Sequence, residues 1–413
     1  MGDTQARCAT SNSGYERLLP WGRAEALMRR RDVDAVVASS PENVTYASEY
    51  WGLSHWARRG TQVYAVVWNE PARSVDLIVP AALADLVTET VSAAARIHVY
   101  GNFVLGSASL PDNDHERQLL ELVTDAANPT SGPELLLKVL RARLGSGRVA
   151  VEHTGLADGA LTTLADGLAE VELVDAGPLL REFRAVKSDQ EVELLRRAAQ
   201  ITEQAAESAL IAAHPGATET DIAQRFMTAL IEQGALPETT VIGTGRRSAL
   251  PNALPVEREL RSGDVLRFDI GCRFGHYVSD IARCVALERV GGSERSLYRA
   301  LANGLEEAAA LLAPGVGTSE VYAAAMAAAR RDGIPDYQRT HCGHGIGIAN
   351  YDLPNITATS TEMLEPGMVI CIETPYYRLG EFGLQVEDTF LITDDGAERF
   401  TQAPRELLIL TDW

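Results

Sequence analysis

Cysteine is scarce in this chain, and its spacing excludes two classes of protein. The 413 residues include five cysteines and no CxxC pair; they are Cys8, Cys272, Cys284, Cys342 and Cys371. An odd number of cysteines without paired spacing argues against a disulfide framework and against a structural zinc finger. We therefore expect reduced thiols and a cytoplasmic protein.

Positive charge and long apolar runs are also lacking. Lysine and arginine total 37 against 57 acidic residues, for a formal net charge of -20. An acidic surface repels nucleic acid and anionic lipid, so we expect neither as a partner. No apolar run approaches the roughly 20 residues that span a bilayer. Residues 1–14 lack the apolar centre of a signal peptide, and we expect them to form a disordered tail.

What the chain does have is an ordinary globular composition, with length enough for two domains. Between residues 15 and 178, helix-like and strand-like segments alternate; RAEALMRRRDV precedes VDAVVAS, and TQVYAVVW precedes SVDLIVP. Such alternation is typical of an α/β domain. We expect this domain to end near Gly177-Pro178.

The order of elements changes after residue 178. The stretch SDQEVELLRRAAQITEQAAESALIAA predicts a long helix capped by Ser188, with Glu191 completing a capping box. A second helix, TETDIAQRFMTALIEQG, ends at Gly234. Strands around 264–288, alanine-rich helices around 293–332 and strands around 366–393 follow. This order predicts an α+β domain over residues 179–413.

Four acidic residues of the second domain lie in apolar, strand-like surroundings. They are Asp269 and Asp280 in VLRFDIGCRFGHYVSDIARC, Glu373 in GMVICIETPYY and Glu387 in GLQVEDTFLI. Burial of each carboxylate costs several kcal/mol unless positive charge lies nearby. Arg283 is the best candidate among the few cations in these segments. A pair of divalent cations would also compensate the charge, with His344 of HCGHGIGIANYD as a fifth ligand.

Taken one at a time, these residues have simpler explanations, as helix caps, solvated turn residues or a structural histidine. The set, in this order and in these surroundings, favours a metal site. The segments that carry it resemble the M24 pita-bread metallopeptidases, which include aminopeptidase P, prolidase and methionine aminopeptidase. FDIG with YVSDIAR, then GHGIG, IETPYY and VEDTF, occur in the order of that family.

The first half of the chain is similar to the creatinase/prolidase N-terminal domain. The similarity lies in RAEALMRRRDVDAVVASSPENVTYASEYWG and in the junction FRAVKSDQEVELLRRAAQIT. Together the two resemblances cover nearly the whole chain beyond the tail. They imply a creatinase-like α/β domain over residues 15–178 and a pita-bread α+β catalytic domain over residues 179–413.

The resemblance also implies roles for matching residues. Asp269 would bind one metal ion, Asp280 and Glu387 would bridge two ions, and His344 and Glu373 would complete the second. Two divalent ions, manganese first and cobalt, zinc or iron as alternatives, would activate water against an amide carbonyl. Glu373 would accept the proton and pass it to the leaving nitrogen. The implied substrate is a small peptide or amide, and the implied assembly is a homodimer.

Three positions depart from the family pattern. Asn252 and Tyr351 stand where the peptidases usually carry histidines that contact the substrate, and Gln385 stands where proline-specific members often carry arginine. Asparagine and tyrosine donate hydrogen bonds but carry no positive charge at neutral pH. Loss of one such donor costs a factor on the order of 10²–10³ in rate. The departures therefore favour a different substrate or a different arrangement of donors.

Other residues are candidates for the missing contacts. His341, three residues before His344, joins Tyr351 and Asn252 as a catalytic candidate. The candidates for binding substrate are Gln385, His276, Arg246 and Arg247, and the two arginines suit a substrate carboxylate. A hairpin-surface histidine and a solvated arginine pair are the competing interpretations.

Two further sets of candidates are weaker. In YWGLSHWARRG, His55 and Trp56 are candidates to cover a partner chain's site, because related dimers use this region; core or interface aromatics are the alternative. Cys342 and Cys371 each precede a proposed ligand by two residues, and a thiolate there would favour zinc or iron. Inert buried thiols are the alternative.

Three functions remain open at this point. The first is a dinuclear hydrolase of C–N bonds, similar to Xaa-Pro aminopeptidases and dipeptidases. The second keeps the fold and metals but acts on a non-peptide small molecule, as a creatinase-like or ectoine-hydrolase-like enzyme or a lyase. The third is a pita-bread binding module without catalysis. Retention of all five ligands disfavours the third, and we expect the first.

Overall fold

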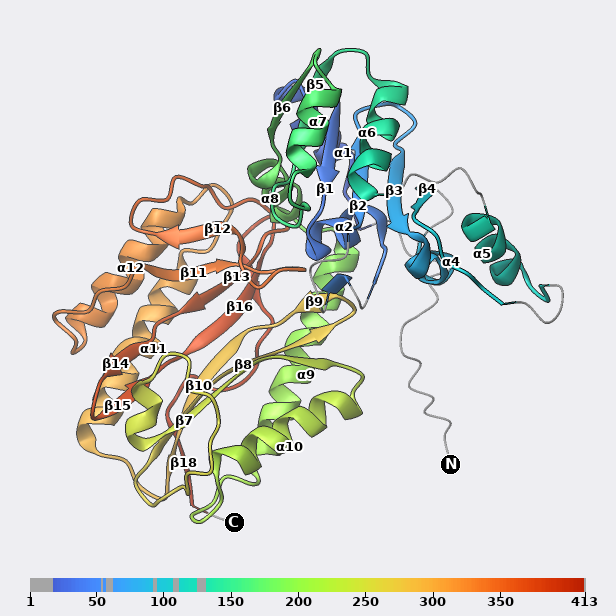
Figure 1. Cartoon of the computed structure of the whole chain (residues 1–413). Helices are drawn as coiled ribbons and strands as arrows, with labels where there is room; N and C mark the ends of the chain where they lie inside the picture. The colour runs from blue at the N-terminus through green and yellow to red at the C-terminus, as the bar shows by residue number, and fades with distance from the viewer. Residues whose placement is uncertain are drawn as a thin grey trace. The chain divides into compact units, whose positions relative to one another are not determined.

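The computed structural model describes residues 18–52, 55–56, 62–91, 95–106, 111–124 and 131–411. The expected tail over residues 1–14 lies outside the described residues. The chain divides into two compact units after Arg184, and Figure 1 shows each unit as a sheet with helices. The sequence placed the boundary at Gly177-Pro178, which is where helix α8 (Gly177–Ala185) begins.

The N-terminal unit is built on a six-stranded mixed sheet in the order β4-β3-β2-β1-β5-β6. Its strands are β1 (Ala35–Ala38), β2 (Tyr64–Trp68), β3 (Val75–Pro80), β4 (Ala95–Tyr100), β5 (Gly147–Val151) and β6 (Val171–Asp175). Strands β1 and β2 are apolar and buried along their whole length. Continuous apolar strands are typical of a sheet that is covered on both faces. The helix-like segments that alternate with these strands in the sequence provide that cover.

Helices complete the N-terminal unit. They are α1 (Trp21–Arg30), α2 (Pro41–Ser48), α4 (Ala84–Thr90), α5 (Asp114–Thr124), α6 (Gly132–Arg143), α7 (Ala160–Gly167) and α8, with a 3-10 turn η1 (Ala81–Leu83). Leu136 and Leu140 of α6 pack in one core cluster with Val37 of β1 and Val66 of β2. None of the helices in the described part of the chain is long and apolar enough to cross a membrane.

The C-terminal unit is built on a ten-stranded sheet whose main path runs β12-β11-β13-β16-β10-β8-β7. These strands are β7 (Leu236–Thr244), β8 (Val265–Phe274), β10 (Ile281–Leu287), β11 (His341–Gly345), β12 (Asp352–Thr357), β13 (Val369–Glu373) and β16 (Glu387–Ile392). Off this path, β9 (Tyr277–Val278) pairs with β8, β17 (Ala397–Arg399) with β16, and β18 (Leu408–Leu410) with β10. Strand β14 (Tyr376–Arg378) pairs separately with β15 (Phe382–Leu384).

Four helices pack against this sheet (Figure 1). They are α9 (Asp189–Leu210), α10 (Glu219–Glu232), α11 (Gly292–Ala310) and α12 (Thr318–Arg331), and a 3-10 turn η2 (Gly245–Ala249) follows β7. The expected capping box is present: Glu191 N–H donates to Ser188 Oγ at 3.4 Å, and Ser188 N–H donates to Glu191 Oε2 at 2.8 Å. The α+β order expected for this half is confirmed.

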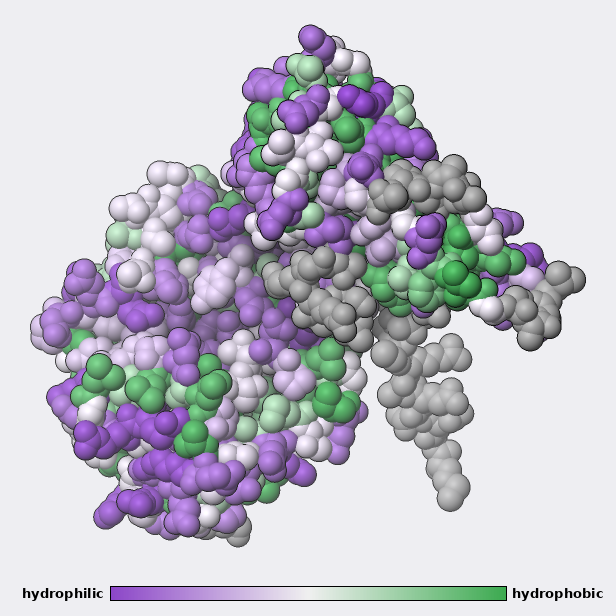
Figure 2. Space-filling view, in the orientation of Figure 1, coloured by the Kyte–Doolittle hydropathy of each residue, from purple (hydrophilic) through white to green (hydrophobic). Residues whose placement is uncertain are grey.

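The two faces of the C-terminal sheet differ in chemistry. Phe268 and Ile270 of β8 belong to the core cluster beneath α9 and α10, so Asp269 between them points to the other face. On β13, Ile372 packs in the cluster beneath α11 and α12, so Glu373 points away from those helices. Alternation along each strand therefore places acids on the face that the helices leave open. Figure 2 shows that the visible surface of this unit is largely hydrophilic, with small separate hydrophobic patches.

Candidate metal centre

One row of paired residues carries three acids across the sheet. Asp269 pairs with Ala282, Ala282 with Glu387, and Glu387 with Glu373. Paired residues on neighbouring strands share a face. The small side chain of Ala282 leaves space above the sheet between Asp269 and Glu387, and the three carboxylates can converge there.

The remaining two predicted ligands lie one step from this row. Asp280 immediately precedes β10, two residues before Ala282. His344 of β11 pairs with Cys371 of β13, two residues before Glu373. Four of the predicted ligands thus lie on the adjacent strands β11-β13-β16-β10-β8 and Asp280 directly before β10, although the positions run from 269 to 387 in the sequence.

Two groups of potential ligand atoms share Glu387. Carboxylate oxygens of Asp269, Asp280 and Glu387 lie within 4.8 Å of one another. Ligand atoms of His344, Cys371 and Glu387 form a second group with the same spacing. A carboxylate that belongs to two groups is the arrangement expected between two metal ions, because its two oxygens can serve one ion each.

The electrostatics of this cluster call for added positive charge. Burial, and next the charge of Asp269, raise the pKa of Asp280 well above its ordinary value. Burial, and next the charge of Asp280, raise the pKa of Glu387 well above its ordinary value. Among the described residues, Asp280 Oδ1 and Glu387 Oε1 are buried and have no hydrogen-bond partner. Buried polar atoms are nearly always satisfied, and a divalent cation is the partner that both oxygens fit.

The two histidines of the HCGHG segment, His341 and His344, have distinct partners. His344 Nδ1 lies 3.0 Å from the carbonyl oxygen of Gly345. Because a carbonyl only accepts, Nδ1 carries the proton and Nε2 offers a lone pair to a metal. His341 Nε2 lies 2.8 Å from Glu373 Oε1. Burial by itself raises the pKa of Glu373, but this hydrogen bond and the neighbouring imidazoles outweigh it and hold the pKa below its ordinary value.

Tyr351 lies at the same site. Its ring centroid is 4.1 Å from that of His344 and 6.4 Å from that of His341. The side chain is 59% exposed. Burial of its inner part, and next the charge of Glu373, raise the pKa of Tyr351. The hydroxyl is therefore protonated at neutral pH and available as a donor.

Gln385 joins two of the acids. Its Nε2 donates to Asp269 Oδ2 at 3.0 Å and to Glu373 Oε2 at 3.4 Å. Its Oε1 accepts from Arg267 at 2.7 Å and from the Tyr377 hydroxyl at 3.4 Å. Gln385 was predicted as a substrate-binding candidate; the structure places its amide against carboxylates of the cluster.

Other predicted site residues make different contacts. Arg247 Nε pairs with Glu219 Oε2 at 3.0 Å. Arg246 is exposed on η2 and lines an open cavity with other arginines of that region. Asn252 is exposed in the turn after η2 and, within the described residues, makes no side-chain hydrogen bond to the acids.

His276 occupies the turn between β8 and β9 in a left-handed conformation, with φ 75°. Burial, and next the charge of Arg273, lower the pKa of His276 to about 4, so the imidazole is neutral at physiological pH.

In the N-terminal unit, His55 Nε2 lies 3.3 Å from the Ser39 carbonyl oxygen, and Trp56 Nε1 donates to Thr45 Oγ1 at 3.2 Å. Both side chains have partners within their own unit.

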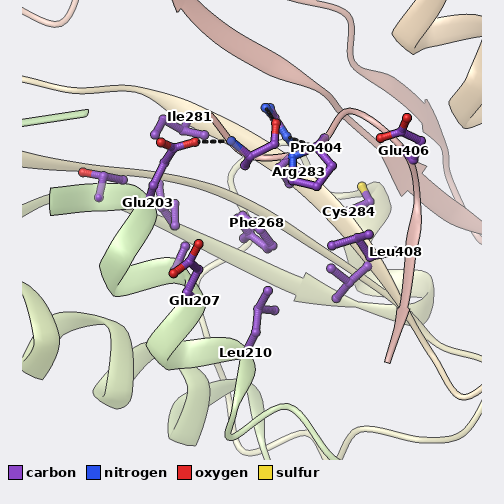
Figure 3. A pocket seen from close by; sticks show the side chains of 15 residues that line it. Glu203, Glu207, Leu210, Phe268, Ile281, Arg283, Cys284, Pro404, Glu406 and Leu408 are labelled. Carbon is purple, nitrogen blue, oxygen red and sulfur yellow. Dashed lines mark hydrogen bonds between the residues drawn. The ribbon is translucent and has the colours of Figure 1, made fainter. Parts of the chain in front are cut away.

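Arg283 does not compensate the carboxylate cluster as the sequence suggested. It pairs with Phe268 in register and so lies on the helix-covered face. There its guanidinium donates to Asp388 Oδ1 and to the Glu387 carbonyl oxygen, each at 2.5 Å. Arg283 lines a cavity of about 110 Å³. Figure 3 shows it there, with Glu203 and Leu408 among the other lining residues. This cavity lies behind the sheet from the acids.

The cysteines near the site are free thiols, as are Cys272 and Cys284. Burial, and next the charge of Glu387, raise the pKa of Cys371 well above its ordinary value. Burial, and next the charge of Glu373, raise the pKa of Cys342.

Comparison with known proteins identifies the class. The family model for metallopeptidase family M24 matches residues 193–394, and the model for the creatinase/prolidase N-terminal domain matches residues 21–186. The chain belongs to metallopeptidase family M24, with the two-domain organisation of its prolidase-like members.

Individual relatives are dipeptidases by name. The Xaa-Pro dipeptidase of Pyrococcus furiosus is 31% identical over 234 residues, which are 56% of this chain and 67% of that protein. A probable dipeptidase of Mycobacterium tuberculosis is 32% identical over 249 residues, which are 60% of this chain and 66% of that protein.

Solved structures show the same fold. The prolidase of Pyrococcus horikoshii superposes with a TM-score of 0.76 at 23% identity, over 94% of this chain and 99% of that one. The recombinant prolidase of Thermococcus sibiricus gives a TM-score of 0.78 at 22% identity, over 97% of this chain and 100% of that one. The predicted fold, a creatinase-like domain followed by a pita-bread domain, is confirmed.

Sequence reasoning missed Arg267, the largest fully buried side chain of the described chain. It lies two residues before Asp269 on β8, and its NH1 is 3.9 Å from Asp269 Oδ2. The signal was present in VLRFDIG, where one arginine interrupts an apolar strand. A buried cation needs a nearby anion. Arg267, and not Arg283, is therefore the arginine that lies beside the carboxylates.

Proposed function

We propose that the protein is a dinuclear metal-dependent hydrolase that cleaves Xaa-Pro dipeptides. The observation that carries the proposal is the shared position of Glu387 in two groups of ligand atoms, with unsatisfied oxygens on Asp280 and Glu387. As the family resemblance implies, Asp269 would hold one ion, His344 and Glu373 the other, and Asp280 and Glu387 would serve both. Bound metal ions would polarise the amide carbonyl and activate water.

The chain's own residues have defined tasks in such a reaction. Glu373, hydrogen-bonded to His341, is placed to accept a proton and pass it to the leaving nitrogen. The imidazole of His341 holds the Glu373 carboxylate in one orientation during that transfer. The hydroxyl of Tyr351, whose side chain is largely exposed, would supply a hydrogen bond to a substrate oxygen, in the place that the family gives to a histidine.

A dipeptide is favoured over longer peptides by the names of the relatives, which include an Xaa-Pro dipeptidase and a probable dipeptidase. Manganese is the proposed metal because the ligand set is mainly carboxylate oxygen and imidazole. The free state of all four described cysteines supports a reducing, cytoplasmic setting. We further propose a homodimer, on the family resemblance alone.

Hydrolysis of Ala-Pro and Gly-Pro by Mn²⁺-loaded protein tests the proposal, with Ala-Pro-Ala and Ala-Ala as comparison substrates. We expect turnover of the two proline dipeptides and slower turnover of the others. The variant Glu373→Gln should lose activity against all of them. A chain that binds metal but hydrolyses none of these peptides would refute the peptidase assignment.

The second candidate function is hydrolysis of a non-peptide amide or guanidino compound on the same metals. The exposed Asn252 and the exposed Tyr351 favour it, because neither can carry the positive charge of a histidine. Creatine and cyclic amidines are the substrates to assay if proline dipeptides are inert.

A further inference from the structure

Arg267 is a buried cation held mostly by neutral groups. Its side chain is 0% exposed. Nε donates to the Ser248 carbonyl at 2.8 Å, and NH2 donates to the carbonyls of Leu250 and Pro251 at 2.6 and 3.0 Å. These contacts fix the guanidinium rigidly but do not neutralise it. The remaining nitrogen, NH1, faces the site: it donates to Gln385 Oε1 and lies near Asp269.

The amide of Gln385 is hydrogen-bonded both to Arg267 and to the acids, and Arg267 NH1 itself lies 3.9 Å from Asp269 Oδ2, beyond hydrogen-bond distance. A guanidinium only donates, so its contact with Gln385 Oε1 settles which way the amide points. Nε2 must then face Asp269 and Glu373, as observed. Gln385 is 1% exposed, so water does not compete for these hydrogen bonds. The chain Arg267–Gln385–carboxylates is continuous and buried.

Aromatic packing reinforces this arrangement. The guanidinium of Arg267 lies over the Tyr377 ring, 5.2 Å from its centroid, and that of Arg339 lies 5.7 Å from the same centroid. The Tyr377 hydroxyl also donates to Gln385 Oε1 at 3.4 Å. Two donors thus converge on the amide oxygen, which leaves the amide one orientation.

We propose that Arg267 is a positioning residue of the metal centre and acts through Gln385. The proposal rests on the proposed metal-dependent function. The guanidinium polarises the amide, and the amide N–H₂ holds one oxygen of Asp269 and one of Glu373. These two acids flank the shared carboxylate of Glu387 in the row across the sheet. This relay, from Arg267 through Gln385 to the two acids, therefore fixes the position of the Asp269 carboxylate relative to that of Glu373.

The first test removes the amide without removing its bulk. Gln385→Met should weaken Mn²⁺ binding about 10- to 100-fold, as loss of a partner that orients ligands typically does. Isothermal titration of the metal-free chain with Mn²⁺ measures this, and a thermal melt of the same sample checks the fold. Gln402→Met, at an exposed glutamine, is the matched control and should bind Mn²⁺ as the wild type does.

The second test exchanges the two groups. Arg267→Gln and Gln385→Arg should each weaken Mn²⁺ binding, the first by removing the charge and the second by placing two guanidiniums together. The double variant Arg267→Gln/Gln385→Arg should recover at least tenfold over the weaker single variant. Recovery of this kind is the signature of coupled residues. A double variant whose loss equals the product of the two single losses would overturn the relay.

These results separate failure of the relay from failure of the proposed function. A wild-type chain that binds no Mn²⁺ contradicts the proposed function, and the relay with it. A wild-type chain that binds Mn²⁺, beside a folded Gln385→Met chain that binds it equally well, contradicts the relay alone. If Arg267→Gln does not fold by itself, the comparison of Gln385→Met with the wild type decides the question.

Discussion

At the scale of single residues, Tyr351 is the group whose exposed side chain a substrate would contact. Its ring stacks on His344, so removal of the hydroxyl leaves the stacking and the metal ligands intact. We expect Tyr351→Phe to keep its metal content and to lose on the order of 10² in kcat, the usual cost of one such donor. Steady-state kinetics with a proline dipeptide measure this, and Tyr376→Phe serves as control. An unchanged kcat would remove Tyr351 from the reaction.

Single residues also show where sequence reasoning succeeds and fails. Asp269, Asp280, Glu373 and Glu387 were identified because each carboxylate interrupts an apolar strand, a conflict that burial makes costly. The arginine expected to compensate these carboxylates, Arg283, was the wrong one, because Arg267 lies beside Asp269 instead. Arg283 and Arg267 both stand in β-strand surroundings, and only the pairing of β10 with β8 and β16 decides which face each occupies. Register of this kind is a long-range property that local patterns do not contain.

Strand β11 shows how glycine positions a ligand at the scale of elements. A β-carbon at Gly345 would lie 2.0 Å from the Leu353 carbonyl oxygen, and one at Gly343 would lie 2.2 Å from the Cys371 carbonyl oxygen. Both glycines therefore let β12 and β13 approach the backbone on either side of His344. The sequence did not predict this strand, because glycine-rich segments have low strand propensity.

Gly345→Ala should accordingly lower the free energy of unfolding by about 1–3 kcal/mol, the usual cost of overpacking. It should also weaken metal binding, because the displaced backbone carries His344. Chemical denaturation and a Mn²⁺ titration measure the two effects. Gly292→Ala is the matched control: no atom lies within 4 Å of its β-carbon position at the start of α11. Equal stability of the two variants would contradict the packing argument.

Helix α9 provides a prediction on pH dependence. Burial raises the pKa of Glu191, the capping-box acid, to about 7, against roughly 4.3 in an unfolded chain. The folded state therefore holds this proton more tightly than the unfolded state. Its contribution to stability is fully present below about pH 4 and is lost as pH rises through 7.

Glu191→Gln keeps the capping box and abolishes this titration. Relative to the wild type, the variant should gain stability between pH 5 and pH 8, by on the order of 3 kcal/mol. Denaturant unfolding at the two pH values measures the gain. Glu207→Gln, at an exposed position of the same helix, should show no such gain. If the difference in stability between Glu191→Gln and the wild type is the same at pH 5 and pH 8, Glu191 does not titrate between them and the argument is refuted.

The whole molecule was the level at which sequence and structure agreed best. Alternating elements predicted an α/β unit, and the sequence of helices, strands, helices and strands predicted an α+β unit; both are confirmed. The motifs in their order identified the family. What the sequence did not contain was the strand order β11-β13-β16-β10-β8, which brings distant acids together.

The central claim is that Glu387 is shared by two metal ions. Its most direct test is the number of Mn²⁺ ions bound per chain, measured by elemental analysis after equilibrium dialysis, in the wild type and in Glu387→Gln. We expect two ions in the wild type. In Glu387→Gln we expect binding at both positions to weaken together, because each group of ligands loses the same carboxylate. A wild type that saturates at one ion, or a Glu387→Gln chain that still binds two as tightly, would contradict the account.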